Sequence, residues 1–413
     1  MFEGREKPEM VERAMLVSIY FDPSEAGEKQ AMLDELEDLV SNLGIGIAGK
    51  HLVKSRDMHA KFLCGTGKAQ EVKQLALDCR ADCVVFDNML SPSQQREWER
   101  LVDECVIDRE EVILDIFARR ARTREASLQV ELARMQYSLP RMARMWNHLD
   151  RQGGGSGGGK GGGGAARGEG EKQIEVDRRL ARARIEAIQR ELVLVTRQRA
   201  TQRKERERQA VATAAIVGYT NAGKSSLLSL VSGSEVMARD MLFATLDTTT
   251  RKIELPHGQP LLLTDTVGFI RNLPHRLVEA FKSTLEEAVL ADFLIQVVDA
   301  SDPEAVRHYE TTLEVLNELG AGDKPMIVVL NKVDLVPEER RGALETLLAP
   351  HFSGRVVPMS VKEGNGEGDL LNACVEMLES RVRRARFLIP YTRSDLVAAM
   401  HSEGKVFSTE YVE

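Results

Sequence analysis

The stretch "VATAAIVGYTNAGKSSLLSLV", residues 211–231, constrains the fold of this chain more than any other part of it. Its pattern is an apolar strand, a glycine-containing turn and a helix, and Gly218-x-x-x-x-Gly223-Lys224-Ser225 matches the full phosphate-loop pattern. Glycines let backbone N–H groups approach phosphate oxygens, and the dipole of the following helix favours the negative charge. Lys224 is expected to contact the β- and γ-phosphates, and Ser225 to offer its hydroxyl to Mg²⁺. The segment therefore predicts an α/β fold that binds a nucleotide.

A second phosphate-side signal follows downstream, where the apolar strand "LLLTD" ends in Asp265-x-x-Gly268. An aspartate at that place can hold Mg²⁺ through a water molecule, and the Gly268 N–H can contact a γ-phosphate. Taken alone the pattern is only suggestive, because any strand end can carry an aspartate followed by a glycine turn.

The segment "MIVVLNKVDL", residues 326–335, indicates which nucleotide binds. It is another buried strand, and it ends in Asn331-Lys332-x-Asp334. A carboxylate at 334 accepts from both N1–H and the exocyclic amine of guanine, whereas adenine has an acceptor at that ring position and no amine beside it. Asn331 is expected to bond the other edge of the base, and the Lys332 stem to cover its face.

One more strand leads into Ser360-Val361-Lys362, a loop that can bring a backbone N–H to guanine O6. Ligands of open α/β sheets bind at the carboxyl ends of the strands. Because every motif in this order follows a predicted strand, the series predicts GTP as the ligand.

Charge is distributed unevenly along the 413 residues. The net charge is −8, yet residues 118–209 hold 22 Lys and Arg against 11 Asp and Glu. A basic middle third in an acidic protein predicts one element that meets polyanions, with a solvated pair of charged helices as the alternative. No apolar run approaches the roughly 20 residues of a membrane span. The five cysteines show no metal-type pairing, so we expect free thiols and a cytoplasmic protein, with peripheral membrane association left open.

Residues 1–115 are predicted to form a small α/β domain with parallel strand pairing. Strands are expected at 12–21 and 82–87, and helices at 24–44 and from Ser91-Pro92 to about 105. Inside this domain, Gly65-Thr66-Gly67-Lys68 lacks the spacing of a phosphate loop. A tight turn before a helix is favoured there over an anion or RNA contact.

Residues 116–209 are predicted to form an antiparallel helical hairpin, because two helices with narrow apolar stripes can bury them only against each other. Pro140 predicts a kink in the first helix. The stretch 153–170 holds twelve glycines and is predicted to be the tip where the chain reverses. The stripes consist of Leu128, Leu132, Met135, Leu139, Met142, Trp146 and Leu149, and of Ala181, Ile185, Ile188, Leu192 and Val195. Contact with RNA phosphates is expected along the second helix, with Arg178, Arg179, Arg182 and Arg184 as candidates.

These motifs resemble those of the translation-factor-related GTPases and, within them, the HflX-type GTPases. The likeness rests on "GYTNAGKS", "FATLD" (243–247), "DTVGF" and "NKVD", and on "DREEVILDIFARRARTREASLQVELARMQY" (108–137). It also rests on the glycine-rich stretch that continues into "GEGEKQIEVDRR" (168–179), so it covers nearly the whole chain.

The resemblance implies a Ras-like P-loop G domain at 210–379, preceded by the small N-terminal α/β domain and its hairpin arm. A short C-terminal α/β unit at 380–413 is expected to be strand, helix and strand. As partners it implies GTP and GDP, and also the large (50S) ribosomal subunit and its rRNA, with the tip directed toward the peptidyl-transferase centre. It further implies GTP-regulated splitting, recycling or rescue of ribosomes, especially under stress, by a protein that is monomeric off the ribosome.

The site residues follow from the motifs and the resemblance together. The expected GTP-binding residues are Gly218, Tyr219, Thr220, Asn221, Ala222, Gly223, Lys224, Ser225, Phe243, Ala244, Thr245, Leu246, Asp247, Asp265, Thr266, Val267, Gly268, Asn331, Lys332, Val333, Asp334, Ser360, Val361 and Lys362. By the resemblance, Thr245 is the switch threonine that ligates Mg²⁺ beside Ser225, whereas the sequence alone does not choose it over Thr248, Thr249 or Thr250. Lys224, Thr245 and Gly268 are expected to position the phosphate and the attacking water.

Some residues depart from the patterns of related GTPases. Where Ras-like proteins carry a water-orienting glutamine, this chain has Phe269, so we expect a hydrophobic plug and slow intrinsic hydrolysis that the ribosome accelerates. Asn221 resembles the asparagine of potassium-dependent relatives and is a candidate K⁺ ligand, with a turn-stabilising role as the alternative. Asp247 is followed by Thr248 instead of the usual proline, and Val361 replaces the usual alanine.

Two other classes of function stay open. One is a GTP-regulated signalling switch that binds proteins through the arm, and the other is a GTP-dependent RNA remodeller that does not act on ribosomes.

Overall fold

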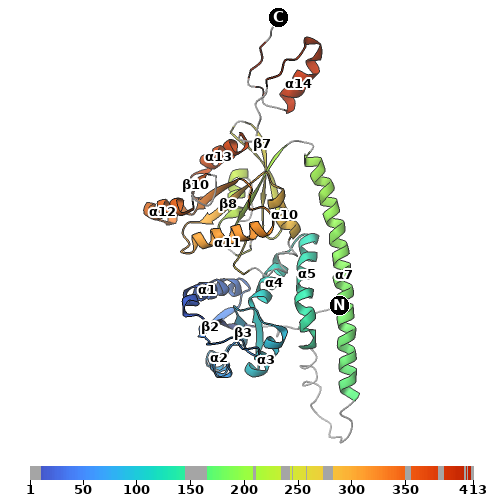
Figure 1. Ribbon diagram of the computed structural model, residues 1–413, viewed down its shortest axis with the longest axis vertical. Helices are drawn as coiled ribbons and strands as arrows, with labels where there is room; N and C mark the ends of the chain where they lie inside the picture. Colours follow the sequence, from blue (N-terminus) through green and yellow to red (C-terminus); the bar gives the residue numbers. More distant parts are fainter. Residues whose placement is uncertain are drawn as a thin grey trace.

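The computed structural model describes residues 11–144, 165–207, 211–233, 242–243, 245–256, 258–272, 282–348, 355–379, 386–403, 406 and 408–410. Two β-sheets lie one below the other, and a long helix, α7, runs along one side of both (Figure 1). No helix in the described part of the chain combines the length and the apolar character that crossing a membrane requires.

The lower sheet has four parallel strands in the order β2-β1-β3-β4. Alternate residues of β1 face two different cores: Leu16 packs with residues of α1 and α4, whereas Met15 and Val17 pack with α2 and α3. A parallel sheet covered on both faces explains why β1 and β3 are almost uniformly apolar. The elements are β1 (Arg13–Tyr20), α1 (Ala26–Asn42), β2 (Gly46–Lys54), α2 (Thr66–Asp78), β3 (Cys83–Phe86), α3 (Pro92–Val102), β4 (Cys105–Asp108) and α4 (Arg109–Arg120).

The local signals of this unit act as the sequence indicates, with one difference. Ser91 and Gln94 form a complete capping box at the start of α3. That helix ends earlier than predicted, because Asp103 adopts a left-handed conformation with φ 68° and β4 follows at once. Gly65 is the N-cap of α2, which confirms the turn before a helix, and Lys68 pairs with Glu71 at 2.6 Å.

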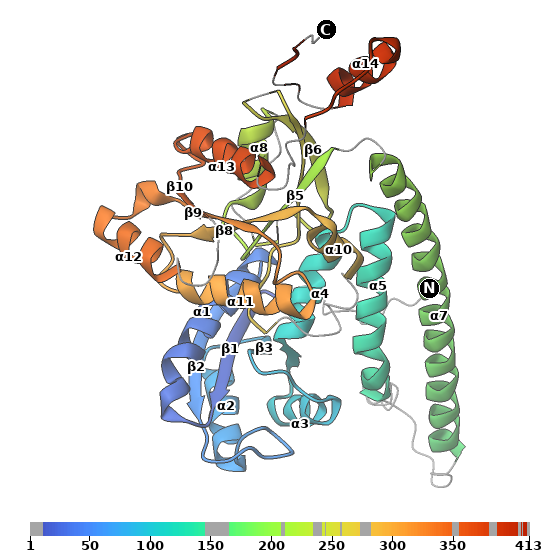
Figure 2. The same ribbon diagram turned by 45° about the horizontal axis from the view of Figure 1, so that its top comes forward.

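The paired apolar stripes of the arm are confirmed. Leu128 and Leu132 of α5 (Arg124–Ser138) form a buried cluster with Ile188 of α7 (Ala165–Glu207). The two helices lie side by side in both views (Figure 2).

The bounds of the arm differ from the prediction in three places. The first helix starts only after the break that follows α4, and it ends before Pro140, which lies in the 3-10 helix η2 (Leu139–Arg144). A proline in a helix interior removes a hydrogen bond and clashes with the preceding turn. Residues 165–170 of the predicted glycine tip are the first turns of α7, whereas 153–164 lie outside the described residues, as do Trp146 and Leu149. In addition, α4 continues across 115–116, so the predicted division falls inside a helix; the domain bounds stay a prediction.

The upper sheet has six strands in the order β10-β9-β8-β5-β7-β6, and only β6 is antiparallel to its neighbour. This is the strand arrangement of a Ras-like domain with its phosphate loop after a central strand. The strands are β5 (Ala212–Gly218), β6 (Thr249–Glu254), β7 (Pro260–Asp265), β8 (Phe293–Asp299), β9 (Met326–Asn331) and β10 (Val356–Pro358). The helices are α8 (Lys224–Ser232), α10 (Lys282–Leu290), α11 (Ala305–Glu318), α12 (Glu338–Leu348) and α13 (Glu367–Glu379).

One hydrophobic core is continuous between the two sheets. It contains Leu36 and Phe117 from the lower unit together with Tyr219, Phe243 and Phe269 from the upper one. The two units therefore pack through buried side chains, which positions the phosphate loop directly above α1 and α4.

The C-terminal unit contains the 3-10 helix η5 (Tyr391–Arg393) and α14 (Ser394–Glu403). The predicted flanking strands are wrong as far as residues 386–390 and 408–410 are concerned, since these have no strand partner. Leu388 and Tyr391 are exposed there, so the apolar pattern that suggested a strand is not buried against a sheet.

Candidate functional site

The phosphate loop joins β5 to α8, and its backbone requires glycine at both ends of the motif. Gly218 has φ 144° and Gly223 has φ 99°. A Cβ on Gly218 would lie 2.3 Å from the carbonyl oxygen of Val297, and one on Gly223 would lie 2.2 Å from Nδ2 of Asn331. Asn221 has φ 59°, a conformation that asparagine tolerates better than most residues.

Lys224 is buried in the first turn of α8, where its Nζ donates to the Tyr219 carbonyl oxygen at 2.6 Å. Burial lowers the pKa of Lys224 to about 8, and the charge of Asp265 opposes that shift. A Cβ on Gly268 would lie 2.9 Å from the same Nζ and 3.0 Å from the Thr220 Cα, so the two loops approach each other closely at this glycine. A desolvated ammonium of this kind gains strongly from an anionic partner such as a phosphate.

Three oxygen-bearing side chains meet beside Lys224. The Ser225 hydroxyl lies 2.5 Å from that of Thr245 and donates to Oδ2 of Asp265 at 2.6 Å. Thr245 donates to the same carboxylate oxygen at 2.9 Å. Burial raises the pKa of Asp265, while Lys224 and these hydroxyl donors lower it. Hydroxyl and carboxylate oxygens are the hard ligands that Mg²⁺ prefers, so the residues fit this ion.

The structure distinguishes the threonines that the sequence leaves equivalent. Thr245 reaches the cluster, whereas Thr249 and Thr250 belong to β6, and Thr250 pairs with Thr264 at 2.9 Å. Phe243 is buried, Leu246 is buried beside it, and Ala244 lies outside the described residues.

The Asn331 side chain joins two loops instead of facing open space. Its Nδ2 donates to the Ala222 carbonyl oxygen at 2.8 Å, and its Oδ1 accepts from the Val361 N–H at 3.1 Å. Asn331 thus clamps the phosphate loop, and its expected bond to the edge of the base stays a prediction. Asp334 is exposed just beyond it, in the 3-10 helix η3 (Val333–Leu335), where its carboxylate is open to a ligand.

Lys332 adopts a left-handed conformation with φ 63°, and its Nζ lies 2.6 Å from Oδ2 of Asp299. Asp299 is the last residue of β8. Ligands of open α/β sheets bind at the carboxyl ends of strands, so Asp299 is a site residue that the strand-end pattern could have identified from the sequence. Lys362 is exposed, and Ser360 is buried with its Oγ accepting from the Glu363 N–H at 3.3 Å.

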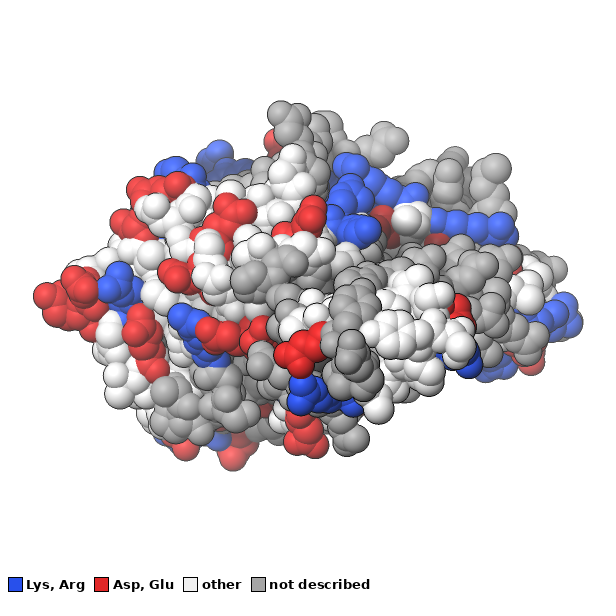
Figure 3. Space-filling model, turned by 90° about the horizontal axis from the view of Figure 1, so that it is seen from above, with Lys and Arg blue, Asp and Glu red and all other residues white. Residues whose placement is uncertain are grey.

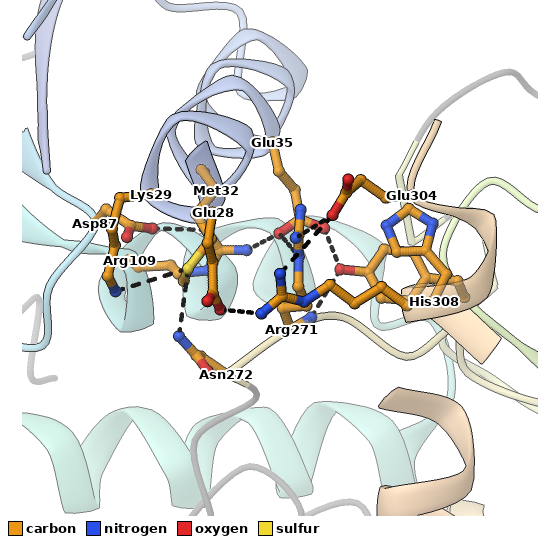
Figure 4. A network of polar contacts seen from close by, with 12 residues as sticks. Glu28, Lys29, Met32, Glu35, Asp87, Arg109, Arg271, Asn272, Glu304 and His308 are labelled. Carbon is orange, nitrogen blue, oxygen red and sulfur yellow. Dashed lines mark hydrogen bonds and ion pairs between the residues drawn. The ribbon is translucent and has the colours of Figure 1, made fainter. Parts of the chain in front are cut away.

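Tyr219 turns its side chain away from the phosphate loop and into the lower unit. Its hydroxyl donates to Glu35 of α1 and accepts from the Arg271 N–H at 2.8 Å, and its ring stacks on His308 with centroids 3.7 Å apart. Glu35 also pairs with Arg109, which pairs with Asp87 at 2.8 Å (Figure 4). Nothing in the sequence near Glu35 indicates this contact, because it joins positions 184 residues apart.

The remaining predicted residues hold the loops in place. Thr266 donates to the Ile216 carbonyl oxygen at 2.7 Å, Val267 is buried, and Thr220 is bonded through its N–H to the Phe269 carbonyl oxygen at 2.8 Å. Phe269 is 1% exposed, which confirms a buried hydrophobic side chain at that place. Arg178, Arg179 and Arg182 lie on α7, away from these loops.

These features together define a P-loop GTPase, an enzyme that binds GTP and GDP and hydrolyses GTP. They are a mainly parallel sheet with a phosphate loop, a hydroxyl–carboxylate cluster beside that loop, and an Asn-Lys-x-Asp loop at the end of a third strand. Three family models match the chain: GTP-binding GTPase N-terminal over 30–118, GTP-binding GTPase Middle Region over 120–206, and 50S ribosome-binding GTPase over 213–332. The chain belongs to the HflX family of GTPases.

Two relatives show how close this membership is. The GTPase HflX of Akkermansia muciniphila is 99% identical over 413 residues, which cover 100% of this chain and 94% of the relative. The GTPase HflX of Escherichia coli is 42% identical over 380 residues, which cover 92% of this chain and 86% of the relative. A solved GTP-binding protein from the hyperthermophilic archaeon Sulfolobus solfataricus in complex with GDP aligns with 90% of this chain and 100% of its own at 23% identity and a TM-score of 0.45.

Proposed function

We propose that this GTPase binds the large (50S) ribosomal subunit in its GTP state and splits, recycles or rescues ribosomes, and that hydrolysis to GDP controls its release. Support comes from the family membership and from the match of residues 213–332 to a model described as a 50S ribosome-binding GTPase. Such a role places the protein in the cytoplasm.

The observation that carries the proposal is the basic helix α7 packed on α5. Arg179 and Arg182 are exposed on α7. Arg184 makes a bidentate pair with Glu131 of α5, in which Nε donates to Oε1 at 2.8 Å and Nη2 donates to Oε2 at 2.9 Å. Seen from above, acidic residues gather on the left half of the molecule, and basic residues are more frequent on the right, the half in which Figure 1 draws α7 (Figure 3). Exposed arginines on one rigid helix suit contact with RNA phosphates.

Co-sedimentation with 50S subunits tests the proposal. The protein should pellet with a non-hydrolysable GTP analogue and stay in the supernatant with GDP, and binding should weaken steeply with salt. The double variant Arg179→Glu, Arg182→Glu should lose this binding and keep GTP affinity, while Arg100→Glu on the surface of α3 serves as the matched charge control. Equal pelleting with GDP and with the analogue contradicts the proposal.

Deleting residues 153–168 tests whether the glycine-rich stretch is a working tip. Loss of ribosome splitting with GTP binding intact supports that role, whereas undiminished splitting identifies the stretch as a passive joint.

Mg²⁺ is the cofactor that the oxygen cluster suits, with Ser225 and Thr245 as ligands and Asp265 beside them. When bound, the ion neutralises charge that develops on the phosphate oxygens. Thr245→Ala should lower the single-turnover rate and raise the Mg²⁺ concentration needed for half-maximal hydrolysis, and an unchanged Mg²⁺ requirement argues against these ligands.

Slow intrinsic hydrolysis is part of the same proposal, because the buried Phe269 cannot orient water. Single-turnover hydrolysis should accelerate when 50S subunits are added, and equal rates with and without them contradict slow intrinsic hydrolysis.

A K⁺ ligand role for Asn221 predicts a slower reaction in NaCl than in KCl. The left-handed backbone at Asn221 supports the plain turn role equally well, so an unchanged rate assigns the residue to the turn.

The signalling switch that binds proteins through the arm remains the second candidate function, and the exposed apolar residues Leu180, Val193 and Leu194 of α7 favour a protein partner for it. Nucleotide-dependent pelleting with ribosomal subunits decides against that candidate and against an RNA remodeller acting elsewhere.

A further inference from the structure

The switch segment 243–247 is bonded directly to the start of the arm helix α5. Oδ2 of Asp247 accepts from the backbone N–H groups of Arg122 and Thr123, each at 3.1 Å, and Oδ1 accepts from the Thr123 hydroxyl. One carboxylate thus receives three hydrogen bonds from two consecutive residues.

Helix capping accounts for only part of this contact. Thr123 already caps α5, since its Oγ1 accepts from the Ala126 N–H at 3.2 Å. Asp247 bonds the N–H of the cap residue, a donor without an intrahelical partner, and also the N–H of Arg122, which lies before the cap. The carboxylate therefore fixes the position of its own segment relative to α5.

A second contact holds the other end of the same segment. The ring of Phe243 meets that of Phe117 on α4 edge to face, with centroids 4.7 Å apart. Thr245 lies midway between these two anchors, and its hydroxyl is the one that reaches Ser225 and Asp265. A short segment held at both ends leaves the residue between them few positions to adopt.

The helix α5 also packs on the second helix of the arm, α7. Leu128 and Leu132 pack against Ile188 of α7, and Arg124 pairs with Glu191 at 3.0 Å. The same helix therefore contacts both the switch segment and the long basic helix, with no flexible linker between the two contacts.

We propose that Thr123 and Asp247 are positioning residues for GTP hydrolysis: through their contact, α5 holds the Thr245 hydroxyl at the phosphate side of the site. The proposal rests on the proposed role of Thr245 in Mg²⁺ binding and hydrolysis. It adds Thr123, and it assigns Asp247 a role through Thr245 in place of the direct GTP contact expected from the sequence.

Kinetic measurements on Thr123→Ala, Asp247→Ala and the double variant test this inference. Each should hydrolyse GTP about tenfold more slowly at saturating nucleotide, since misplacing a reacting group is costly. The half-saturating Mg²⁺ concentration should rise, and the affinity for GDP should stay within about twofold of wild type because the guanine loop and phosphate loop are untouched. The double variant should be no slower than Asp247→Ala, because that change already removes all three hydrogen bonds, whereas Thr123→Ala removes only the one from the hydroxyl.

Two matched variants separate positioning from stability. Thr123→Ser keeps the hydroxyl and should restore the wild-type rate. Ser91→Ala removes a comparable cap from α3, far from the switch, and should lower the melting temperature without changing hydrolysis. If Thr123→Ala only lowers the melting temperature, as Ser91→Ala does, the positioning role is overturned.

The outcome also separates this inference from the proposed function. Slow hydrolysis in Thr245→Ala together with wild-type rates in Thr123→Ala and Asp247→Ala overturns the inference alone. Wild-type hydrolysis in Thr245→Ala overturns the role of that threonine and the inference with it.

Discussion

Asn331 donates a hydrogen bond of 2.8 Å to the carbonyl oxygen of Ala222, so the loop that follows β9 holds the phosphate loop in shape. Its Oδ1 bonds the Val361 N–H as well, and the side chain is 3% exposed. A single residue therefore joins three loops that come from distant parts of the chain.

Replacing Asn331 with Ala should weaken GTP and GDP binding equally. The change leaves the Ala222 carbonyl, which is buried, without a partner at a cost of about 1–3 kcal/mol, and the part-buried Val361 N–H adds less. Fluorescent GDP titration measures the loss, expected at ten- to a few hundredfold, about 1.4 kcal/mol per tenfold. Asn42→Ala on α1 is the control. A loss for GTP only would mean that Asn331 does not shape the loop common to both nucleotides.

Gly218→Ala should abolish nucleotide binding and lower the melting temperature. The new Cβ would lie 2.3 Å from the Val297 carbonyl oxygen, and the φ of 144° is strained for any other residue. The matched change Gly67→Ala meets no atom within 4 Å and lies in a helix. It should leave GTP binding unchanged and stabilise the protein by up to about 1 kcal/mol. Reduced GTP binding in Gly67→Ala would instead point to a second anion site in the lower unit.

Asp334→Asn should change the preferred base. The carboxylate is placed to accept from the N1–H and amine of guanine, whereas an amide offers a donor where xanthine carries a carbonyl. GTP affinity should fall by about two orders of magnitude and xanthosine triphosphate should bind better than GTP. Competition titrations with the two nucleotides check this, and retained preference for GTP would place the base elsewhere.

Nucleotide affinity should fall as the pH rises through about 8. Burial lowers the pKa of Lys224 to about 8 in the nucleotide-free protein, and a bound phosphate raises it again, so binding takes up a proton above pH 8. Below that pH the ammonium is already charged and affinity should be flat. GDP should bind about tenfold more weakly at pH 9 than at pH 7, and Lys224→Met should lose this dependence. A flat profile in the wild type would contradict the shifted pKa.

Arg109→Met should strongly destabilise the lower unit, since Arg109 and both of its ion-pair partners lie there. Arg109 is 2% exposed and pairs with Glu35 and with the fully buried Asp87, so its removal leaves the Asp87 carboxylate without its ion-pair partner, at a cost of about 3–5 kcal/mol. Urea unfolding measures this cost. Arg100→Ala, which breaks only the exposed pair with Glu97, should change stability by less than about 1 kcal/mol. Similar small losses in both variants would show that the Arg109 network is not a source of stability.

Local pattern predicts much of this protein. The phosphate loop, the guanine loop, the paired stripes of α5 and α7 and the cap of α3 each depend on residues within one turn or one strand end, so their spacing is visible along the chain. Predictions weaken where burial is absent. The C-terminal apolar residues predict strands, yet Phe387 and Leu388 are exposed and residues 386–390 and 408–410 join no sheet.

The sequence by itself determined the class of fold, the choice of guanine and the phosphate loop, because those properties belong to short segments whose backbone chemistry is fixed locally. Only the tertiary structure decided that Thr245 reaches Ser225 and Asp265, that Asn331 bonds the phosphate loop, and that Asp247 is bonded to Thr123. Thr123 and Asp247 are 124 positions apart, and no local spacing encodes a hydrogen bond that forms only when two separate elements pack together.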